Sequence, residues 1–199
     1  MELESTRPYR QGARAASAAR TAERILDAAS ALFWEQPTDR LSLDEVARRA
    51  EVSTQTVIRR FGGRDGLMAA AGEREAARIR RMRDAAPVDD PTEAVAVLAA
   101  HYEEVGDAVI RLLAEEERSP ALADIVRAGR EYHAEWCARV FARTVDGVPA
   151  GERARVLAQL TAVCDVYTWK VLRRDAGLGA RETLTAITEL VAAIEEHER

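Results

Sequence analysis

Residues 41–63 constrain the fold most tightly, because they predict two short amphipathic helices joined by a three-residue turn. Ser42 followed by Glu45 is a capping-box pattern, in which the hydroxyl caps a free N–H and the carboxylate reaches back. Residues 51–53 form the turn, and either Ser53 or Thr54 can cap the second helix. The glycines at 62 and 63 end that helix, because glycine accepts left-handed backbone.

The rest of the chain also has helical periodicity. Apolar residues recur at three- and four-residue spacing, and no strand-like alternation appears. Proline and glycine pairs separate the segments. The pattern predicts an all-α fold of about nine helices, from helical stretches at 21–36, 42–50, 53–61, 65–85, 92–117, 121–146, 151–176 and 180–197, with Gly106 as a candidate interruption of 92–117.

The charge changes sign along the sequence. Residues 1–83 hold sixteen arginines against twelve acidic residues, a net charge of +4, whereas residues 84–199 carry −9. A basic front on an acidic body indicates that a polyanion binds at the front. We predict a flexible basic arm over 1–19, a helix-turn-helix domain over 20–66 and a second helical domain over 67–199.

The polar face of the second short helix has the chemistry of a DNA reader. A helix-turn-helix unit holds its second helix rigidly, so that this face can enter a major groove. Gln55 can pair with an adenine edge, and Arg59 and Arg60 with guanine edges or phosphates. The same residues could also form an ordinary solvated helix face.

At this point the sequence resembles the tetracycline-repressor family of transcriptional regulators. The resemblance covers about fifty residues, and its motifs are Arg24-Ile25-Leu26-Asp27-Ala28-Ala29, Leu32-Phe33, Leu41-Ser42-Leu43-Asp44-Glu45-Val46-Ala47, Ala50-Glu51-Val52-Ser53, Thr56-Val57, Phe61 and Arg64-Asp65-Gly66-Leu67. Two positions depart from the family pattern. Glu51 stands where the family usually has Gly, and Ile58 stands where it usually has a phosphate-contacting Tyr.

The resemblance implies a homodimeric, ligand-responsive regulator, more often a repressor, that binds a palindromic double-stranded DNA operator. It also implies that residues 67–199 form the ligand-sensing and dimerisation domain. Two recognition helices of a two-fold dimer would then lie about one DNA turn apart. The DNA-contacting residues predicted from the motif and its flanks are Ser42, Ser53, Thr54, Gln55, Thr56, Ile58, Arg59, Arg60, Arg64 and Arg14.

Aromatic, histidine and cysteine residues gather on the middle helices of the C-terminal region. They could simply pack in the core with satisfied polar tips. The family resemblance favours a pocket for an unidentified small organic ligand instead. The predicted lining residues are His101, Tyr102, His133, Trp136, Cys137, Cys164, Tyr167 and Trp169.

The last long helical stretches have broad apolar stripes, which suit either a core or a four-helix dimer interface. The residues predicted for that interface are Leu157, Leu160, Thr161, Val171, Leu184, Ile187, Val191 and Ile194.

Several functional classes lack support in the sequence. No nucleophile elbow, phosphate-binding loop or metal-ligand spacing is present, so we expect no enzyme, no metal and no cofactor. No stretch is long and apolar enough to span a membrane, and no signal peptide is visible, so we expect a cytoplasmic protein. Glu51 and Ile58 keep one alternative open, a helical protein-interaction module with weakened DNA binding.

Overall fold

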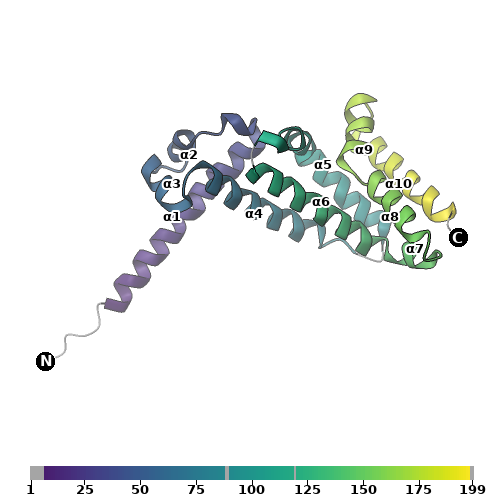
Figure 1. Ribbon diagram of the computed structural model, residues 1–199, viewed down its shortest axis with the longest axis horizontal. Helices are drawn as coiled ribbons and strands as arrows, with labels where there is room; N and C mark the ends of the chain where they lie inside the picture. Colours follow the sequence, from purple (N-terminus) through teal and green to yellow (C-terminus); the bar gives the residue numbers. More distant parts are fainter. Residues whose placement is uncertain (1–6, 88–89, 119, 198–199) are drawn as a thin grey trace. The chain divides into compact units, whose positions relative to one another are not determined.

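A computed structural model describes residues 7–87, 90–118 and 120–197, with side chains from residue 15 onward. Every regular element in these ranges is helical, which confirms the all-α prediction (Figure 1). The chain divides into two compact units, Met1–Glu75 and Ala76–Arg199. Each unit has buried apolar residues of its own.

The first helix, α1 (Arg7–Glu35), is much longer than predicted. Residues 7–19 are helical, so the prediction of a flexible arm over 1–19 is wrong for that part, and residues 1–6 lie outside the described residues. The physical reason is composition, because arginine and alanine favour helix and a proline near the start costs little. The C-terminal half of α1 buries Ile25, Ala29 and Leu32, which lie on one stripe.

Three further elements complete the first unit. A single 3-10 turn, η1 (Thr38–Arg40), leads to α2 (Leu43–Arg49) and α3 (Thr54–Phe61). Val46 and Val57 are fully buried, one on each short helix, so α2 and α3 expose their opposite, polar faces. Gly62 ends α3 in the left-handed conformation at φ 77°, as predicted.

The division between the two units falls inside α4 (Arg64–Arg83), after Glu75 and not after residue 66 as predicted. The first half of α4 is tied to α1. Trp34 Nε1 donates to Glu75 Oε2 over 2.9 Å, and Arg74 pairs with Glu23 at 3.2 Å and with Asp27. These side-chain bonds add the start of α4 to the N-terminal unit.

In the described residues, the second unit consists of the end of α4, six further α-helices and two short turns, η2 and η3. Its elements are α5 (Pro91–Ala114), η2 (Glu116–Arg118), α6 (Pro120–Val140), α7 (Ala142–Gly147), α8 (Arg153–Val163), α9 (Val166–Lys170), the π-helical turn η3 (Val171–Asp175) and α10 (Ala180–His197). Its core contains Tyr102, Trp136, Phe141, Leu160 and Trp169.

Two predicted helices are each interrupted. The stretch 121–146 breaks at Phe141, between α6 and α7. The stretch 151–176 breaks at Cys164, where α8 ends and α9 begins. Asp165 explains the second break, because its carboxylate accepts a hydrogen bond from Tyr167 N at 2.8 Å and so caps a new helix.

A close approach between α5 and α9 fixes the middle of the second unit. A Cβ on Gly106 would lie 2.5 Å from the ring of Trp169, which is fully buried. We predict that Gly106→Ala lowers the free energy of unfolding by about 1–3 kcal/mol, the usual cost of overpacking a core.

The matched control is Gly129→Ala in α6, where an added Cβ meets nothing within 4 Å. It should raise the free energy of unfolding by about 0.5–1 kcal/mol, because alanine favours helix more than glycine does. Urea denaturation followed by circular dichroism measures both. Equal effects of the two substitutions would show that Gly106 is not a packing constraint.

Candidate nucleic-acid interface

The two short helices of the first unit begin with serine caps. Ser42 Oγ accepts a hydrogen bond from Glu45 N at 3.1 Å, and Ser53 Oγ accepts one from Thr56 N at 3.2 Å. Only the serine half of the predicted capping box forms. The Glu45 carboxylate turns away from Ser42 and accepts from Arg48 Nη2 at 2.7 Å and Arg49 Nε at 3.0 Å.

The turn between the helices is made by a strained residue. Glu51 has φ 53°, and among the described residues it is the only non-glycine residue with a left-handed backbone. This is the position at which the sequence departs from the family's glycine. The exposed Glu51 carboxylate lies 3.6 Å from Arg24 of α1, a contact of little energetic weight at that exposure. The turn therefore keeps its geometry without the glycine.

Most of the predicted reading residues lie on the exposed side of α3. Ser53, Gln55, Arg59 and Arg60 are exposed, Thr56 is half-buried, and Ile58 is an exposed large apolar side chain at 39%. Thr54 is the exception, because its hydroxyl donates to Asp44 Oδ1 at 2.6 Å and ties α3 to α2. Thr54 is thus occupied within the fold.

Arginines are neutralised on α2 and unpaired on α3. Arg48 and Arg49 share Glu45, which lowers the pKa of that carboxyl to about 2, through its hydrogen bond to Arg48 first and to Arg49 second. Arg59 and Arg60 form no ion pair with any residue that the structure describes. The free positive charge of this motif is therefore concentrated on the face of α3.

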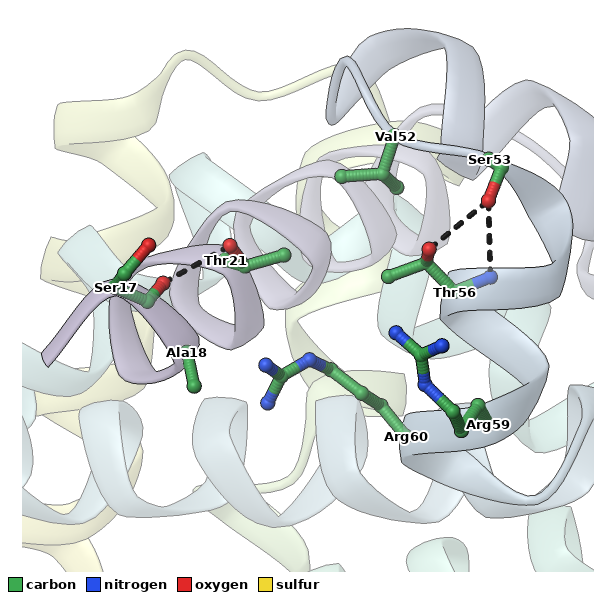
Figure 2. Close-up of a pocket in the computed structure, with 8 residues that line it drawn as sticks. All are labelled: Ser17, Ala18, Thr21, Val52, Ser53, Thr56, Arg59 and Arg60. Atoms are coloured by element: carbon green, nitrogen blue, oxygen red, sulfur yellow. Dashed lines mark hydrogen bonds between the residues drawn. The ribbon is translucent and has the colours of Figure 1, made fainter. Parts of the chain in front are cut away.

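A groove of about 420 Å³ lies beside these arginines, between α3 and the N-terminal part of α1 (Figure 2). Ser17, Ala18 and Thr21 of α1 form one wall, and Thr56, Arg59 and Arg60 of α3 form the other. Figure 2 shows the Arg60 side chain extending toward Ala18. Hydroxyls and guanidinium groups along an open groove are suited to a phosphate backbone.

Sequence reasoning missed the α1 wall of this groove. Ser17, Ala18 and Thr21 follow the helical spacing of one face, but that signal was hidden by the prediction of a flexible arm over 1–19. Thr21 Oγ1 donates to the carbonyl oxygen of Ser17 at 3.0 Å, so the two residues are held together on the helix.

Two other predicted DNA-contacting residues have different positions. Arg64 is engaged within the fold, because its guanidinium donates to the carbonyl oxygens of Leu41 at 3.3 Å and Thr38. These bonds join the start of α4 to the segment before α2. Arg14 belongs to α1, but its side chain lies outside the described residues.

The second unit brings together most of the predicted pocket residues. Seven of the eight are buried, and Tyr167 is 50% exposed and stands apart. The Tyr102 hydroxyl donates to the carbonyl oxygen of Cys164 at 3.1 Å, and Tyr102 and Trp169 have ring centroids 6.1 Å apart. Burial lowers the pKa of His101 to about 3 with the help of the Arg83 charge, so its imidazole is neutral.

The predicted dimer residues divide into two groups. Leu160, Ile187 and Val191 are buried within the unit's own core, so they are not available to a partner. Val171 is 54% exposed, and Leu157, Thr161, Leu184 and Ile194 are half-buried. A groove of about 350 Å³ on the outer side of α8 and α10 is lined by Gln159, Val163, Leu190, Ala193, Ile194 and His197.

Within the described ranges, no helix is long and apolar enough to cross a membrane. The same residues contain no cluster of three or more His, Cys, Asp or Glu side chains that could hold a metal ion.

The capped pair of short helices, with a polar and positively charged second helix, defines a helix-turn-helix protein of the DNA-binding class. Residues 25–71 match the model of the bacterial regulatory proteins of the tetR family. The match to this family, which the sequence resemblance predicted, is thus confirmed for residues 25–71.

Solved structures support the same fold over most of the chain. A transcriptional regulator from Rhodococcus sp. Rha1 has a TM-score of 0.69 at 20% identity, with 88% of this chain and 96% of that chain covered. A TetR transcriptional regulator from Legionella pneumophila has a TM-score of 0.65 at 16% identity, with coverages of 89% and 97%. The multidrug binding protein EbrR, complexed with imidazole, has a TM-score of 0.59 at 24% identity, with coverages of 85% and 88%. A comparison with curated proteins found no match.

The left-handed turn yields a test of local strain. A residue with a side chain costs about 1–2 kcal/mol when its backbone is left-handed. Glycine avoids this cost, but part of the gain is lost because glycine raises the conformational entropy of the unfolded chain. We predict that Glu51→Gly raises the free energy of unfolding by about 0.5–1 kcal/mol in urea denaturation. Glu51→Ala is the control, because it removes the Arg24 contact and keeps the strain. A destabilising Glu51→Gly would contradict this account of the turn.

Proposed function

We propose that the protein is a transcriptional regulator, acting as a repressor, that inserts α3 into the major groove of an operator. The observation that carries the proposal is the pair of unneutralised guanidinium groups, Arg59 and Arg60, on the exposed face of a capped recognition helix. The tetR-family match over residues 25–71 supports this assignment.

The polar residues of α3 divide between two kinds of contact. Gln55 is exposed on the first turn of the helix, where side chains of a recognition helix contact base edges. Arg60 lines the groove beside α1, so we assign it to the phosphate backbone, with the Ser17 hydroxyl as an additional donor. Ile58, without a hydroxyl, can make only an apolar contact.

A two-fold dimer would present two copies of α3 to a palindromic operator. The outer side of α8 and α10 supports such a dimer, because Leu190 at 44% and Ile194 leave apolar surface exposed beside small residues such as Ala193. In the proposed interface, these residues take the place of Leu160, Ile187 and Val191, because those three side chains are buried in the core of the unit.

We also propose that a small organic ligand controls DNA binding through the second unit. Support comes from the gathering of Tyr102, Trp136 and Trp169 with polar groups among them, and from the similar fold of EbrR, whose structure is a complex with imidazole. The α4 helix begins in one compact unit and ends in the other, so a ligand that prefers one α4 orientation could change the spacing of the recognition helices.

The test of DNA binding is fluorescence anisotropy with a labelled duplex from the region upstream of the protein's own coding sequence, compared with a scrambled duplex. The proposal expects tighter binding to the first duplex and a loss of affinity as salt rises. Equal affinity for both duplexes at all salt concentrations would overturn sequence-specific regulation at this site, and would favour the protein-interaction alternative.

Replacing the two free arginines should weaken binding. We predict that Arg59→Gln with Arg60→Gln lowers affinity for the duplex by about 10- to 100-fold and makes it less dependent on salt, because phosphate and base contacts are lost. The control is Arg48→Gln on α2, an exposed arginine already neutralised by Glu45, which should change affinity by less than about two-fold. Similar losses in both proteins would mean that only net charge matters.

A hydroxyl at position 58 should strengthen backbone contact. We predict that Ile58→Tyr raises affinity about five-fold, because a phenol that donates to a phosphate adds a charge-assisted hydrogen bond. Ile58→Phe adds the ring without the donor, so it should leave affinity close to that of the original protein. Anisotropy titrations on the same duplex compare the three proteins, and an equal gain with Phe would exclude the phosphate contact.

A further inference from the structure

Three guanidinium groups lie around one tyrosine ring in the second unit. The guanidinium carbons of Arg80 and Arg83, both on α4, are each 5.3 Å from the ring centre of Tyr132. The guanidinium carbon of Arg139, on α6, is 5.9 Å from the same centre. We call these three residues the arginine cluster. Like charges repel one another, so such a cluster is stable only to the extent that aromatic rings and anions offset the repulsion.

One carboxylate contacts the arginine cluster. Asp84 Oδ1 accepts hydrogen bonds from Arg139 Nη2 at 2.5 Å and from the Tyr132 hydroxyl at 3.0 Å. Among the residues that the structure describes, no carboxylate pairs with Arg80 or Arg83. Three guanidinium groups against one carboxylate leave two positive charges in excess. The arginine cluster is therefore short of anions.

The burial of Arg83 distinguishes the arginine cluster from an ordinary charged surface. Arg83 is 4% exposed, its guanidinium carbon lies 4.3 Å from the ring centre of Trp136, and its Nε is buried without a hydrogen-bond partner. Its Nη2 lies 3.0 Å from His133 Nδ1. A guanidinium can only donate, so the imidazole accepts this bond and brings no negative charge. A buried charge without a counter-ion is costly, so an anion nearby is strongly favoured.

The other two members of the arginine cluster are open to solvent. Arg80 and Arg139 are both exposed. Within the described part of the chain, the Arg80 side chain has no contact of its charge other than the Tyr132 ring. An anion can therefore approach from the surface and bind Arg80 and Arg139, where the charge of Arg83 also attracts it. This binding requires no entry into the core.

We propose that the arginine cluster binds a small oxyanion with at least two negative charges, which is either an organic polycarboxylate or a phosphate compound. Two negative charges match the excess of the cluster. The planar fork of a guanidinium group matches the oxygens of both carboxylate and phosphate. This inference deepens the proposed function and rests on it, because it makes such an anion the ligand that controls DNA binding.

The position of the arginine cluster on α4 links the anion to DNA binding. Arg80 and Arg83 lie near the C-terminal end of α4, which begins in the DNA-reading unit, and Arg139 lies on α6. A bound anion joins α4 to α6, so it favours the α4 orientation in which residues of both helices reach it. A ligand that prefers one orientation shifts the population toward that orientation.

Isothermal titration calorimetry of the full chain, without DNA and at constant ionic strength, tests the site itself. The probes are citrate and pyrophosphate, with acetate as the singly charged control. We expect one-site binding of citrate or pyrophosphate with a dissociation constant below about 1 mM, and at least about tenfold weaker binding of acetate. The tighter of the two probes distinguishes a carboxylate ligand from a phosphate ligand. Saturable binding of neither would overturn the proposal.

Two neighbouring arginines provide a matched pair of variants. Arg80→Gln should weaken binding of the tighter probe about tenfold, because a charge-assisted contact is lost. The control Arg81→Gln removes the same charge from the next residue, which is exposed and is not a member of the arginine cluster, and should change the affinity by less than about twofold. Equal losses in the two variants would contradict the assigned site, since net charge alone would then explain the binding.

The buried member of the arginine cluster is tested by a substitution that keeps its bulk. Arg83→Met should weaken binding of the tighter probe at least about tenfold. It should also leave the thermal midpoint of the anion-free protein unchanged or higher, because a buried charge without a counter-ion is removed. Circular dichroism checks that the variant is folded. Folded Arg83→Met protein that binds the probe as tightly as the original chain would refute the role of Arg83.

Anisotropy with the labelled upstream duplex separates this inference from the proposed function. A half-saturating concentration of the tighter probe should change the affinity of the original chain for the duplex, and should change that of Arg80→Gln much less. Anion binding in calorimetry without any change in DNA affinity would support the site and exclude this anion as the controlling ligand. Absence of sequence-selective DNA binding, with anion binding intact, would overturn the proposed function and leave the anion site standing.

Discussion

The first unit depends on one tight reversal of the chain, which occurs at Glu51. The backbone there must pass through the left-handed region for α2 and α3 to bury Val46 and Val57 together. Once those two valines are buried, the outward direction of every other α3 side chain follows from helical geometry. Ser53 then has to cap α3, and Thr54 is close enough to Asp44 to tie the helices. The orientation of the reading face is thus a consequence of a single turn.

The distribution of ion pairs has the same origin. On α2, Glu45 lies one turn from Arg48 and Arg49, so the helix neutralises its own cations. On α3, no acidic residue occurs between Thr54 and Phe61, so Arg59 and Arg60 have no local partner. Net charge over residues 1–83 concealed this difference, because the sum is small although two arginines without an ion pair to any described residue lie side by side in the sequence of α3.

Sequence patterns predicted elements well and side-chain environments less well. The cap at Ser42 and the glycine stop at Gly62 are local signals, and both were confirmed. Of the two candidate caps for α3, Ser53 and Thr54, the structure has Ser53. Two departures come from local signals that the helical pattern left ambiguous. The helical state of residues 7–19 depends on composition that was also compatible with a basic arm, and the break at Cys164 depends on the cap supplied by Asp165. Helical stripes could not separate core from surface on α10, where Val191 is buried and Leu190 is exposed.

The three tryptophans are distributed so that their fluorescence can be used to follow each unit separately. Trp34 is in the first unit and half-buried, with its indole N–H on Glu75, whereas Trp136 and Trp169 are buried in the second. Trp136 is stacked under the Arg83 guanidinium, and Trp169 donates to Glu103 at 2.9 Å. Emission from these indoles therefore depends on different neighbours. Single-tryptophan variants of this chain would act as intrinsic spectroscopic probes, one for the DNA-reading unit and two for the core of the other.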